Sequence, residues 1–192
     1  MAKTISEGIG KFYQHHPRVA VVVTACAGGK DNAMTAAWHM PISFQPPLYG
    51  VAIAPERFTC QLIVESKEFG VNFLPFDRAE LVASVGGSRG QEVDKFQRFK
   101  IAKDKSVRTT VPILEAAYAA YECRLVDDRE YGDHRLLIGE IEAVHLQEEA
   151  FTPEGVLNLN KVNPCLYLGN ELYLTVLKDV VRRLDRKIYG RC

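Results

Sequence analysis

The stretch of sequence that decides the fold runs Arg18-Val-Ala-Val-Val-Val-Thr-Ala-Cys26-Ala-Gly-Gly-Lys-Asp-Asn32-Ala-Met-Thr-Ala-Ala-Trp38. Up to Cys26, apolar residues occupy both alternating faces, which is typical of a strand covered on both sides. The two glycines and the polar residues after them predict a turn, and a second strand is predicted from Ala33 to Phe44. The stretch therefore predicts a β-hairpin, the basic unit of an antiparallel sheet.

The rest of the chain repeats this pattern of short strands with helices at irregular places. Further strands are predicted over Leu48–Ala54, Phe69–Leu74, Ala116–Val126, Arg135–Leu146 and Leu166–Val176. Helices are predicted over Ser6–His16, Thr59–Ser66, Asp77–Val85 and Val176–Ile188. The polar and basic stretch Ser88–Lys105 is predicted to be a surface excursion with a short helical piece near Val93–Phe99. Strands in neighbouring pairs with inserted helices predict a mainly β protein, an antiparallel barrel with short flanking helices.

Length and charge limit the class of protein. The chain has 192 residues, which predicts one domain over residues 1–192. Lys plus Arg equals Asp plus Glu at 24 each, and 47% of the residues are hydrophobic, so neither disorder nor an electrostatic nucleic-acid binder is indicated. Small molecules or other proteins remain as partners.

No membrane or metal signal stands out. The longest nearly apolar stretch, Val19–Ala27, is far shorter than the ~20 residues of a membrane-spanning helix. Because the first residues also lack the apolar core of a signal peptide, we expect a cytoplasmic protein. The five cysteines form no C-x-x-C pair and the histidines show no ligand spacing, so we expect no metal site.

The sequence contains none of the common catalytic or nucleotide-binding motifs. There is no G-x-S-x-G, no H-E-x-x-H, no G-x-x-x-x-G-K and no G-x-G-x-x-G after a strand. An enzyme that borrows its chemistry from a cofactor needs few reactive side chains, because the protein mainly binds and orients that cofactor. A cofactor-dependent enzyme therefore remains possible.

Two neighbouring segments could form a binding site. The small residues Ala33, Ala36 and Ala37 would let a flat ring approach the backbone. Arg57 and Thr59, where a helix is predicted to begin, combine a guanidinium group, a hydroxyl group and free amides, which suit a phosphate group. The alternative is an ordinary hairpin followed by a helix with Thr59 as its N-cap and an exposed arginine.

The motifs, taken in order, resemble a known family. They are Asn32-x-x-Thr35, Ser43-x-x-Pro46-Pro47, Arg57-x-Thr59, Phe69-Gly-Val-Asn72, Asp94-Lys95-Phe96 and Gly132-Asp133-His134. This order is similar to that of the flavin reductase-like family of FMN-binding split β-barrels. Trp38-His39 departs from the Ser- or Thr-rich form of many flavin reductases and resembles the flavoredoxin-like branch.

The resemblance implies a homodimer with FMN in a cleft near the subunit interface. It implies an NAD(P)H-dependent flavin reductase that passes hydride to the flavin and electrons on to free flavin, iron or another acceptor. An FMN electron carrier reduced by a protein partner and a non-catalytic flavin-binding domain are the alternatives. The resemblance leaves the choice between NADH and NADPH, and the acceptor, open.

The resemblance also assigns residues to the site. The isoalloxazine ring and ribityl chain would be lined by Asn32, Ala33, Met34, Thr35, Ala36 and Ala37. The phosphate would be held by Arg57, Thr59 and Lys95, with Ser88 or Arg89 nearby. His134 is the catalytic candidate, on the nicotinamide side. The alternatives are that Lys95 is a solvated helix residue, that His134 is a turn residue paired with Asp133, and that Asn72 is structural.

Overall fold

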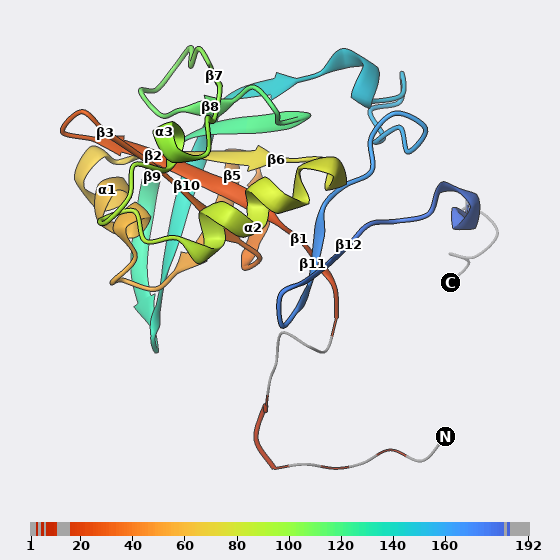
Figure 1. Ribbon diagram of the computed structural model, residues 1–192, viewed down its shortest axis with the longest axis horizontal. Coiled ribbons are helices and arrows are strands. Elements are labelled where there is room, and N and C mark those ends of the chain that lie inside the picture. Colours follow the sequence, from red (N-terminus) through yellow and green to blue (C-terminus); the bar gives the residue numbers. More distant parts are fainter. Residues whose placement is uncertain (1–2, 4, 6, 11–15, 183, 185–192) are drawn as a thin grey trace.

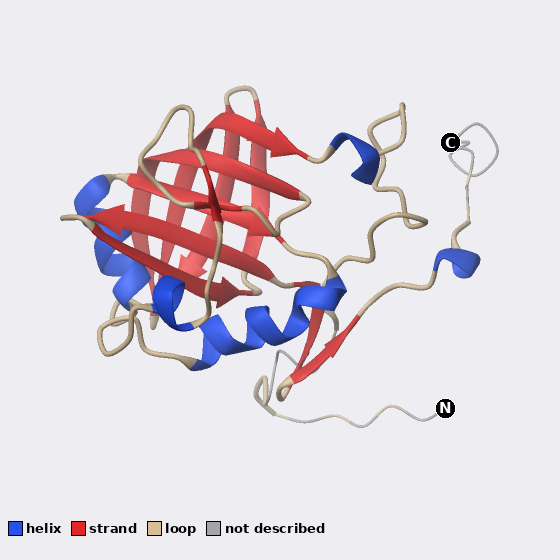
Figure 2. Cartoon of the chain, turned by 45° about the horizontal axis from the view of Figure 1, so that its top comes forward, coloured by secondary structure: helices blue, strands red, loops and turns tan. Residues whose placement is uncertain are grey.

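The computed structural model describes residues 3, 5, 7–10, 16–182 and 184. A seven-stranded sheet in the order β3-β2-β6-β9-β10-β5-β4 dominates the described chain, and every neighbouring pair is antiparallel. Its strands are β2 (Val21–Ala27), β3 (Lys30–Ala36), β4 (His39–Phe44), β5 (Pro47–Ile53), β6 (Glu68–Phe73), β9 (Ala119–Tyr131) and β10 (His134–Leu146). Figure 2 shows the strands curving around a common interior with helices packed outside. β3 and β4 are the two edges of this sheet in the described chain, and the predicted mainly β fold, an antiparallel split barrel with short helices, is confirmed.

Smaller elements complete the fold (Figure 1). A three-stranded sheet joins β1 (Arg18–Val19), β11 (Leu166–Gly169) and β12 (Leu172–Leu174), and β7 (Lys103–Asp104) pairs with β8 (Ile113–Leu114). The α-helices are α1 (Phe58–Ser66), α2 (Ala79–Gly87) and α3 (Lys95–Arg98). Single 3-10 turns are η2 (Phe76–Arg78), η3 (Glu148–Ala150) and η4 (Lys178–Val180). The segment predicted as one strand near Gly169 is thus the β11–β12 hairpin.

The predicted first hairpin is confirmed, but the prediction of its second strand is wrong at one end. Strands β2 and β3 pair with Thr24 opposite Ala33. The chain then leaves the sheet after Ala36, and β4 begins at His39 on the opposite edge. The backbone carbonyl of Trp38 accepts a hydrogen bond from the amide of Ala52, which brings the chain to β5. The continuous apolar pattern hides this change of partner.

The β9–β10 hairpin is longer than predicted. The first of its two predicted strands ends at Val126, whereas Asp127 to Tyr131 also pair with β10. Only Gly132 and Asp133 form the turn, and Gly132 has a φ of 63°, which glycine adopts without strain. This tight turn places His134 at the very tip of the hairpin.

Two apolar clusters hold the helices against the barrel. Ile63 of α1 packs with Phe69 and Val71 of β6, and all three are fully buried. Phe96 of α3 joins the cluster that contains Val82 of α2. The short helix predicted near Val93–Phe99 is confirmed as α3, but the prediction that Ser88–Lys105 is a surface excursion is wrong at its centre, because Phe96 packs in the core.

The predicted role of Asn72 as a structural residue fits its contacts. Its amide nitrogen donates to the carbonyl oxygen of Val22 at 3.0 Å, and its amide oxygen accepts from the amide of Leu114 at 2.8 Å. The residue is fully buried, so these bonds offset the cost of removing its polar side chain from water. Asn72 therefore ties β2, β6 and β8 together.

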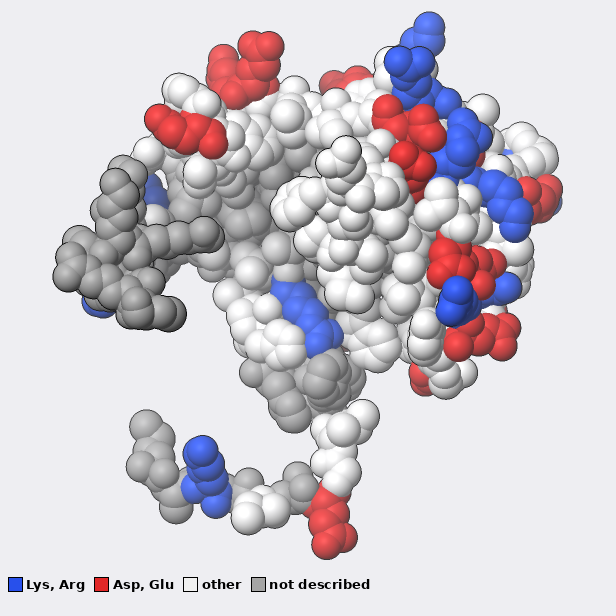
Figure 3. Space-filling view, turned by 180° about the vertical axis from the view of Figure 1, so that it is seen from behind, with Lys and Arg blue, Asp and Glu red and all other residues white. Residues whose placement is uncertain are grey.

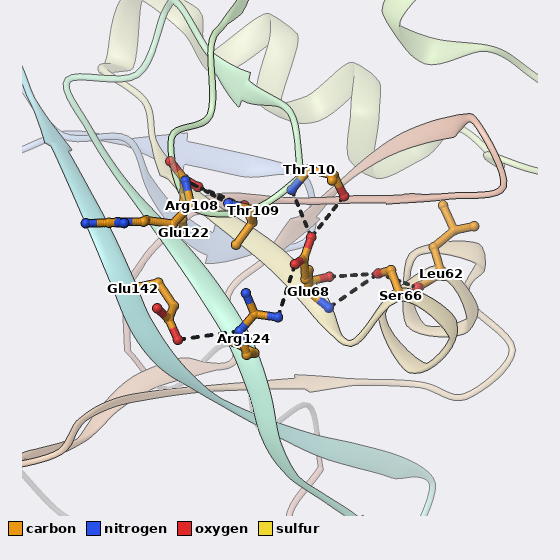
Figure 4. A network of polar contacts seen from close by, with 9 residues as sticks. All are labelled: Leu62, Ser66, Glu68, Arg108, Thr109, Thr110, Glu122, Arg124 and Glu142. Carbon is orange, nitrogen blue, oxygen red and sulfur yellow. Dashed lines mark hydrogen bonds and ion pairs between the residues drawn. The ribbon is translucent and has the colours of Figure 1, made fainter.

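A buried carboxylate fixes the loop that precedes β8 (Figure 4). Glu122 of β9 is fully buried and accepts hydrogen bonds from the amides of Val107, Arg108 and Thr109 and from His145, all at 2.7–2.8 Å. Burial alone would raise the pKa of Glu122, but the bonds, led by the Val107 amide, lower it to about 2. The carboxylate therefore stays ionised and acts as a clamp on the loop.

Other sequence expectations concern the ends and the surface. The predicted helix Ser6–His16 falls mostly outside the described residues. The predicted helix Val176–Ile188 is wrong for residues 176–182, where the only helical element is the single turn η4, and most of its remainder lies outside the described residues. No described helix has the length and apolar character needed to cross a membrane. On the face shown in Figure 3, basic and acidic side chains lie intermixed rather than in a patch of one sign.

Candidate functional site

A cleft of about 890 Å³ is bounded by β3, the end of β5, the first turn of α1, the loop after α2 and the tip of the β9–β10 hairpin. The predicted site residues that line it are Asn32, Met34, Thr35, Ala36, Ala37, Arg57, Thr59, Ser88, Arg89, Lys95 and His134. The side chain of Ala33 instead packs in the cluster beneath α2. The fold thus gathers residues from five separate segments around one cavity.

Lys95 lies at the floor of this cleft. Its side chain is 2% exposed, so the alternative of a solvated helix residue is wrong. The ammonium group donates to the carbonyl oxygens of Ala33 and Val85, both at 2.7 Å. Burial, with a smaller contribution from the Arg57 charge, lowers the pKa of Lys95 to about 8. An ammonium group has three donors, so one remains for a ligand.

Arg57 occupies the N-cap position of α1, and Thr59 lies inside the first turn. The prediction of Thr59 as the N-cap is wrong because α1 already begins at Phe58, and the Thr59 hydroxyl group contacts Asn32 of β3. The Asn32 amide nitrogen donates to the hydroxyl oxygen of Thr59 at 2.8 Å. The first amides of a helix have no intrahelical acceptor, and this end of α1 lines the cleft through Arg57, Phe58 and Thr59.

This part of the cleft is unbalanced in charge. Within the described residues, neither Arg57 nor Lys95 forms an ion pair with a carboxylate. A buried cation is costly unless it is paired, so an anionic ligand would stabilise the site. Two cations beside a helix N-terminus fit the phosphate ester of FMN, by the chemistry of their donors.

Two glycines, one in the last turn of α2 and one in the loop after it, allow this segment to approach β3. A Cβ atom on Gly90 would lie 2.2 Å from the side-chain oxygen of Asn32, and one on Gly86 would lie 3.1 Å from the Cβ of Thr35. The hydroxyl group of Thr35 donates to the carbonyl oxygen of Val82 in α2. The contacts hold the loop that carries Ser88 and Arg89 against the floor of the cleft.

Aromatic rings form another wall. Trp38 follows β3, and its ring centroid lies 4.5 Å from that of His134, with the ring planes tilted by 36°. His134 Nδ1 is 2.7 Å from a carboxylate oxygen of Asp133, which agrees with the predicted turn pairing without removing His134 from the cleft. This hydrogen bond lowers the pKa of Asp133.

His39 plays a different part from its neighbour Trp38. Its two ring nitrogens contact the hydroxyl group of Tyr49 at 2.7 Å and the carbonyl oxygen of Val19 at 2.9 Å. Burial lowers the pKa of His39. Since a carbonyl oxygen only accepts, Nε2 carries a proton, and His39 is a structural link between β4, β5 and β1.

Comparison with known proteins shows the family of the chain. The family model described as "Flavin reductase like domain" matches residues 13–173. The chain belongs to the flavin reductase-like family. Among solved structures of this family's fold, the FMN-binding protein of Thermus thermophilus with bound 1-cyclohex-2-enone has 34% identity and a TM-score of 0.85, covering 95% of this chain and 100% of that one. A second structure of it, with p-hydroxybenzaldehyde, has 33% identity, a TM-score of 0.82 and the same coverage.

Two other relatives of this flavin reductase-like protein are informative. The flavoredoxin of Methanosarcina acetivorans has 25% identity and a TM-score of 0.84, covering 99% of this chain and 100% of that chain. An uncharacterised protein of Aeropyrum pernix is 37% identical over 157 residues, which are 80% of this chain and 58% of the relative. The chain therefore spans little more than half the length of that relative.

The sequence analysis did not predict some of the residues that line the cleft of this flavin reductase-like protein. Arg18 and Tyr167 line the cleft from the small sheet, and Ala52 and Ala54 line it from β5 and the residue after it. In the sequence, Trp38 differs from the usual family pattern, but that difference does not predict that its ring lines the cleft. No local pattern marks these positions, because their place in the cleft depends on pairing between distant segments.

Proposed function

We propose that the protein is an FMN-dependent oxidoreductase that binds FMN in this cleft and takes hydride from NADH or NADPH. The observation that carries the proposal is the buried ammonium group of Lys95 near the Arg57 charge, neither of which forms an ion pair with a carboxylate within the described residues. Such a site gains most from a dianionic phosphate, which distinguishes FMN from riboflavin. The likeness to the FMN-binding protein of Thermus thermophilus supports the same cofactor.

The residues of the cleft have separate tasks in this proposal. Lys95 and Arg57 bind the phosphate together with the first amides of α1, and Ser88 and Arg89 lie beside them. Thr59, held by Asn32, keeps the start of α1 against β3. The ring and the ribityl chain lie along β3, where Met34, Thr35, Ala36 and Ala37 line the cleft.

When bound, FMN supplies the hydride-accepting and electron-passing chemistry, so the protein needs no reactive side chain of its own. The walls of the cleft hold a nicotinamide beside the flavin, and proximity supplies much of the rate. His134 lies on the open side and positions the nicotinamide. We therefore assign His134 to substrate binding rather than to proton transfer.

The second candidate function is that of an FMN electron carrier reduced by a protein partner. The likeness to the flavoredoxin of Methanosarcina acetivorans favours it. The bound enone and aldehyde of the Thermus thermophilus protein instead favour a small conjugated carbonyl compound as electron acceptor. The open aromatic wall of this cleft suits such a compound better than it suits iron.

We also propose that the protein is a homodimer. The edge strand β4 exposes Met40, Ile42 and Phe44, and the side chain of Phe44 is 98% exposed. An unpaired edge with apolar side chains tends to associate unless another surface covers it. A second copy of the chain would cover this edge.

One experiment separates the two candidate functions. The FMN-loaded protein is mixed with NADH or NADPH without oxygen, and the flavin absorption band is followed. Fast bleaching supports the reductase. If the band persists but a reductase partner bleaches it and an acceptor restores it, the carrier is supported. If FMN binds no more tightly than riboflavin, the proposal of an FMN site is wrong.

A further inference from the structure

The helix that carries Lys95 depends on its surroundings for its position. Helix α3 has only four residues, and a single helical turn has too few internal hydrogen bonds to be stable by itself. Its buried apolar residue is Phe96, which lies in the same core cluster as Ala33 of β3 and Leu114 of β8. Contacts that fix Phe96 therefore also fix Lys95, its neighbour in the same turn.

A lysine from the following strand lies over this ring. The ammonium group of Lys103 in β7 is 5.4 Å from the centroid of the Phe96 ring, within the range of a cation–π contact. The same nitrogen lies 2.8 Å from a carboxylate oxygen of Asp31 in β3. The hydrogen bond to Asp31 raises the pKa of Lys103, so this ammonium group is charged at neutral pH. Lys103 thus joins β3 to α3 across the Phe96 ring.

The ion pair lies outside the cleft, next to residues that form the cleft. Neither partner of the pair lines the cavity. Asp31 precedes Asn32, whose amide nitrogen donates to Thr59, and the next residue, Ala33, accepts from the ammonium group of Lys95. Three consecutive residues of β3 therefore hold the ion pair, the first turn of α1 and the side chain of Lys95.

We propose that Lys103, paired with Asp31, is a positioning residue for the FMN phosphate, because the pair holds α3 so that the remaining donor of Lys95 faces the cleft. The inference rests on the proposed function, since it acts through Lys95. The side chains of Lys103 and Asp31 are 46% and 24% exposed, so water weakens their attraction and the effect on binding is modest. The effect falls on FMN rather than riboflavin, because only FMN carries the phosphate.

Positioning and simple charge attraction predict opposite results at Asp31. If Lys103 acted only through its charge, its loss would weaken binding of the phosphate, whereas loss of the Asp31 carboxylate would strengthen it. If the pair positions Lys95, loss of either partner weakens FMN binding. Asp31→Asn therefore distinguishes the two explanations.

The test is a fluorescence titration of the FMN-free full chain with FMN and with riboflavin at pH 7. Lys103→Met and Asp31→Asn should each raise the dissociation constant for FMN about threefold and leave that for riboflavin unchanged. Lys103→Arg keeps the positive charge beside Asp31 and should restore wild-type affinity for FMN. Lys105→Met is the matched control, because it removes the same charge from an exposed residue of the same segment, and it should bind as the wild type does.

A double variant tests the route through Lys95. In a chain that already carries Lys95→Met, Lys103→Met should cause no further loss of FMN affinity, because the group that it positions is absent. Circular dichroism of every variant before titration shows that folded proteins are compared.

Several results would overturn the inference. They are tighter FMN binding by Asp31→Asn, unchanged FMN affinity in both single variants, an equal loss of riboflavin affinity, an equal loss in Lys105→Met, and a threefold loss that persists beside Lys95→Met. A wild-type protein that binds FMN no more tightly than riboflavin would instead refute the proposed function. The comparison of the two flavins in the wild type thus separates the two failures.

Discussion

Replacement of Lys95 by methionine should weaken FMN binding while leaving riboflavin binding nearly unchanged. Methionine has a similar length and no charge, so it removes the remaining donor from the floor of the cleft. A hydrogen bond to a charged group contributes ~1.5–3 kcal/mol, so the dissociation constant for FMN should rise about 10- to 150-fold. Riboflavin lacks the phosphate and should show no comparable change.

The pH dependence gives a second, independent measure. The pKa of Lys95 is lowered to about 8 by burial, so the free protein loses this charge as the pH rises through that value. A bound phosphate dianion favours the charged lysine and raises its pKa again, and proton uptake then accompanies binding. If the pKa returns to ~10.4, the wild-type dissociation constant for FMN should rise about tenfold from pH 7 to pH 9.

The assay is a fluorescence titration of the FMN-free protein with FMN and with riboflavin at pH 7, 8 and 9. Lys95→Met should bind FMN with no pH dependence over this range, because FMN phosphate itself titrates near pH 6. Lys105→Met is the matched control, because Lys105 is exposed and lies just after β7. This variant should behave as the wild type. A flat wild-type profile, or an equal loss of riboflavin affinity in Lys95→Met, would refute the reasoning.

The remaining predictions concern the other cation, the clamp, the hairpin tip and the assembly. Arg57→Ala should weaken the free energy of FMN binding by ~1.5–3 kcal/mol, measured by calorimetry. An unchanged binding titration would show that Arg57 is not part of the site. Glu122→Gln should lower the free energy of unfolding in urea at pH 7 by about 3 kcal/mol, whereas Glu142→Gln, on the same hairpin, should not. Because the folded-state pKa of Glu122 is depressed to about 2, this stabilisation is present above about pH 4.5 and is lost as the pH falls towards 2; equal urea curves for the two variants would contradict the clamp. His134→Asn should raise the KM for nicotinamide more than it slows flavin reduction at saturation, and a loss of ~100-fold or more in the limiting rate would show proton transfer by His134. Light scattering of the FMN-loaded protein should give twice the chain mass of 21.5 kDa, and the mass of a single chain at micromolar concentration would exclude the dimer.

Local sequence determined the positions of most long strands and of helices α1 and α2 of this protein. Short runs rich in apolar residues predicted β2, β5, β6, β9 and β10, because a buried strand leaves such a run, on both faces in the case of β2. The order of short motifs also pointed to the family and to most residues of the cleft, since Asn32, Arg57 and Lys95 each lie within such a motif. These signals depend only on residues close together in the chain.

Tertiary structure alone decided which segments meet. The apolar run from Ala33 to Phe44 does not show that β3 and β4 lie on opposite edges, because that depends on the five strands between them. The burial of Lys95 and the contact of Trp38 with His134 likewise arise from the docking of α3 and the exact length of the β9–β10 hairpin. Pairing between distant segments is set by the packing of the whole core, so no local pattern in the sequence records it.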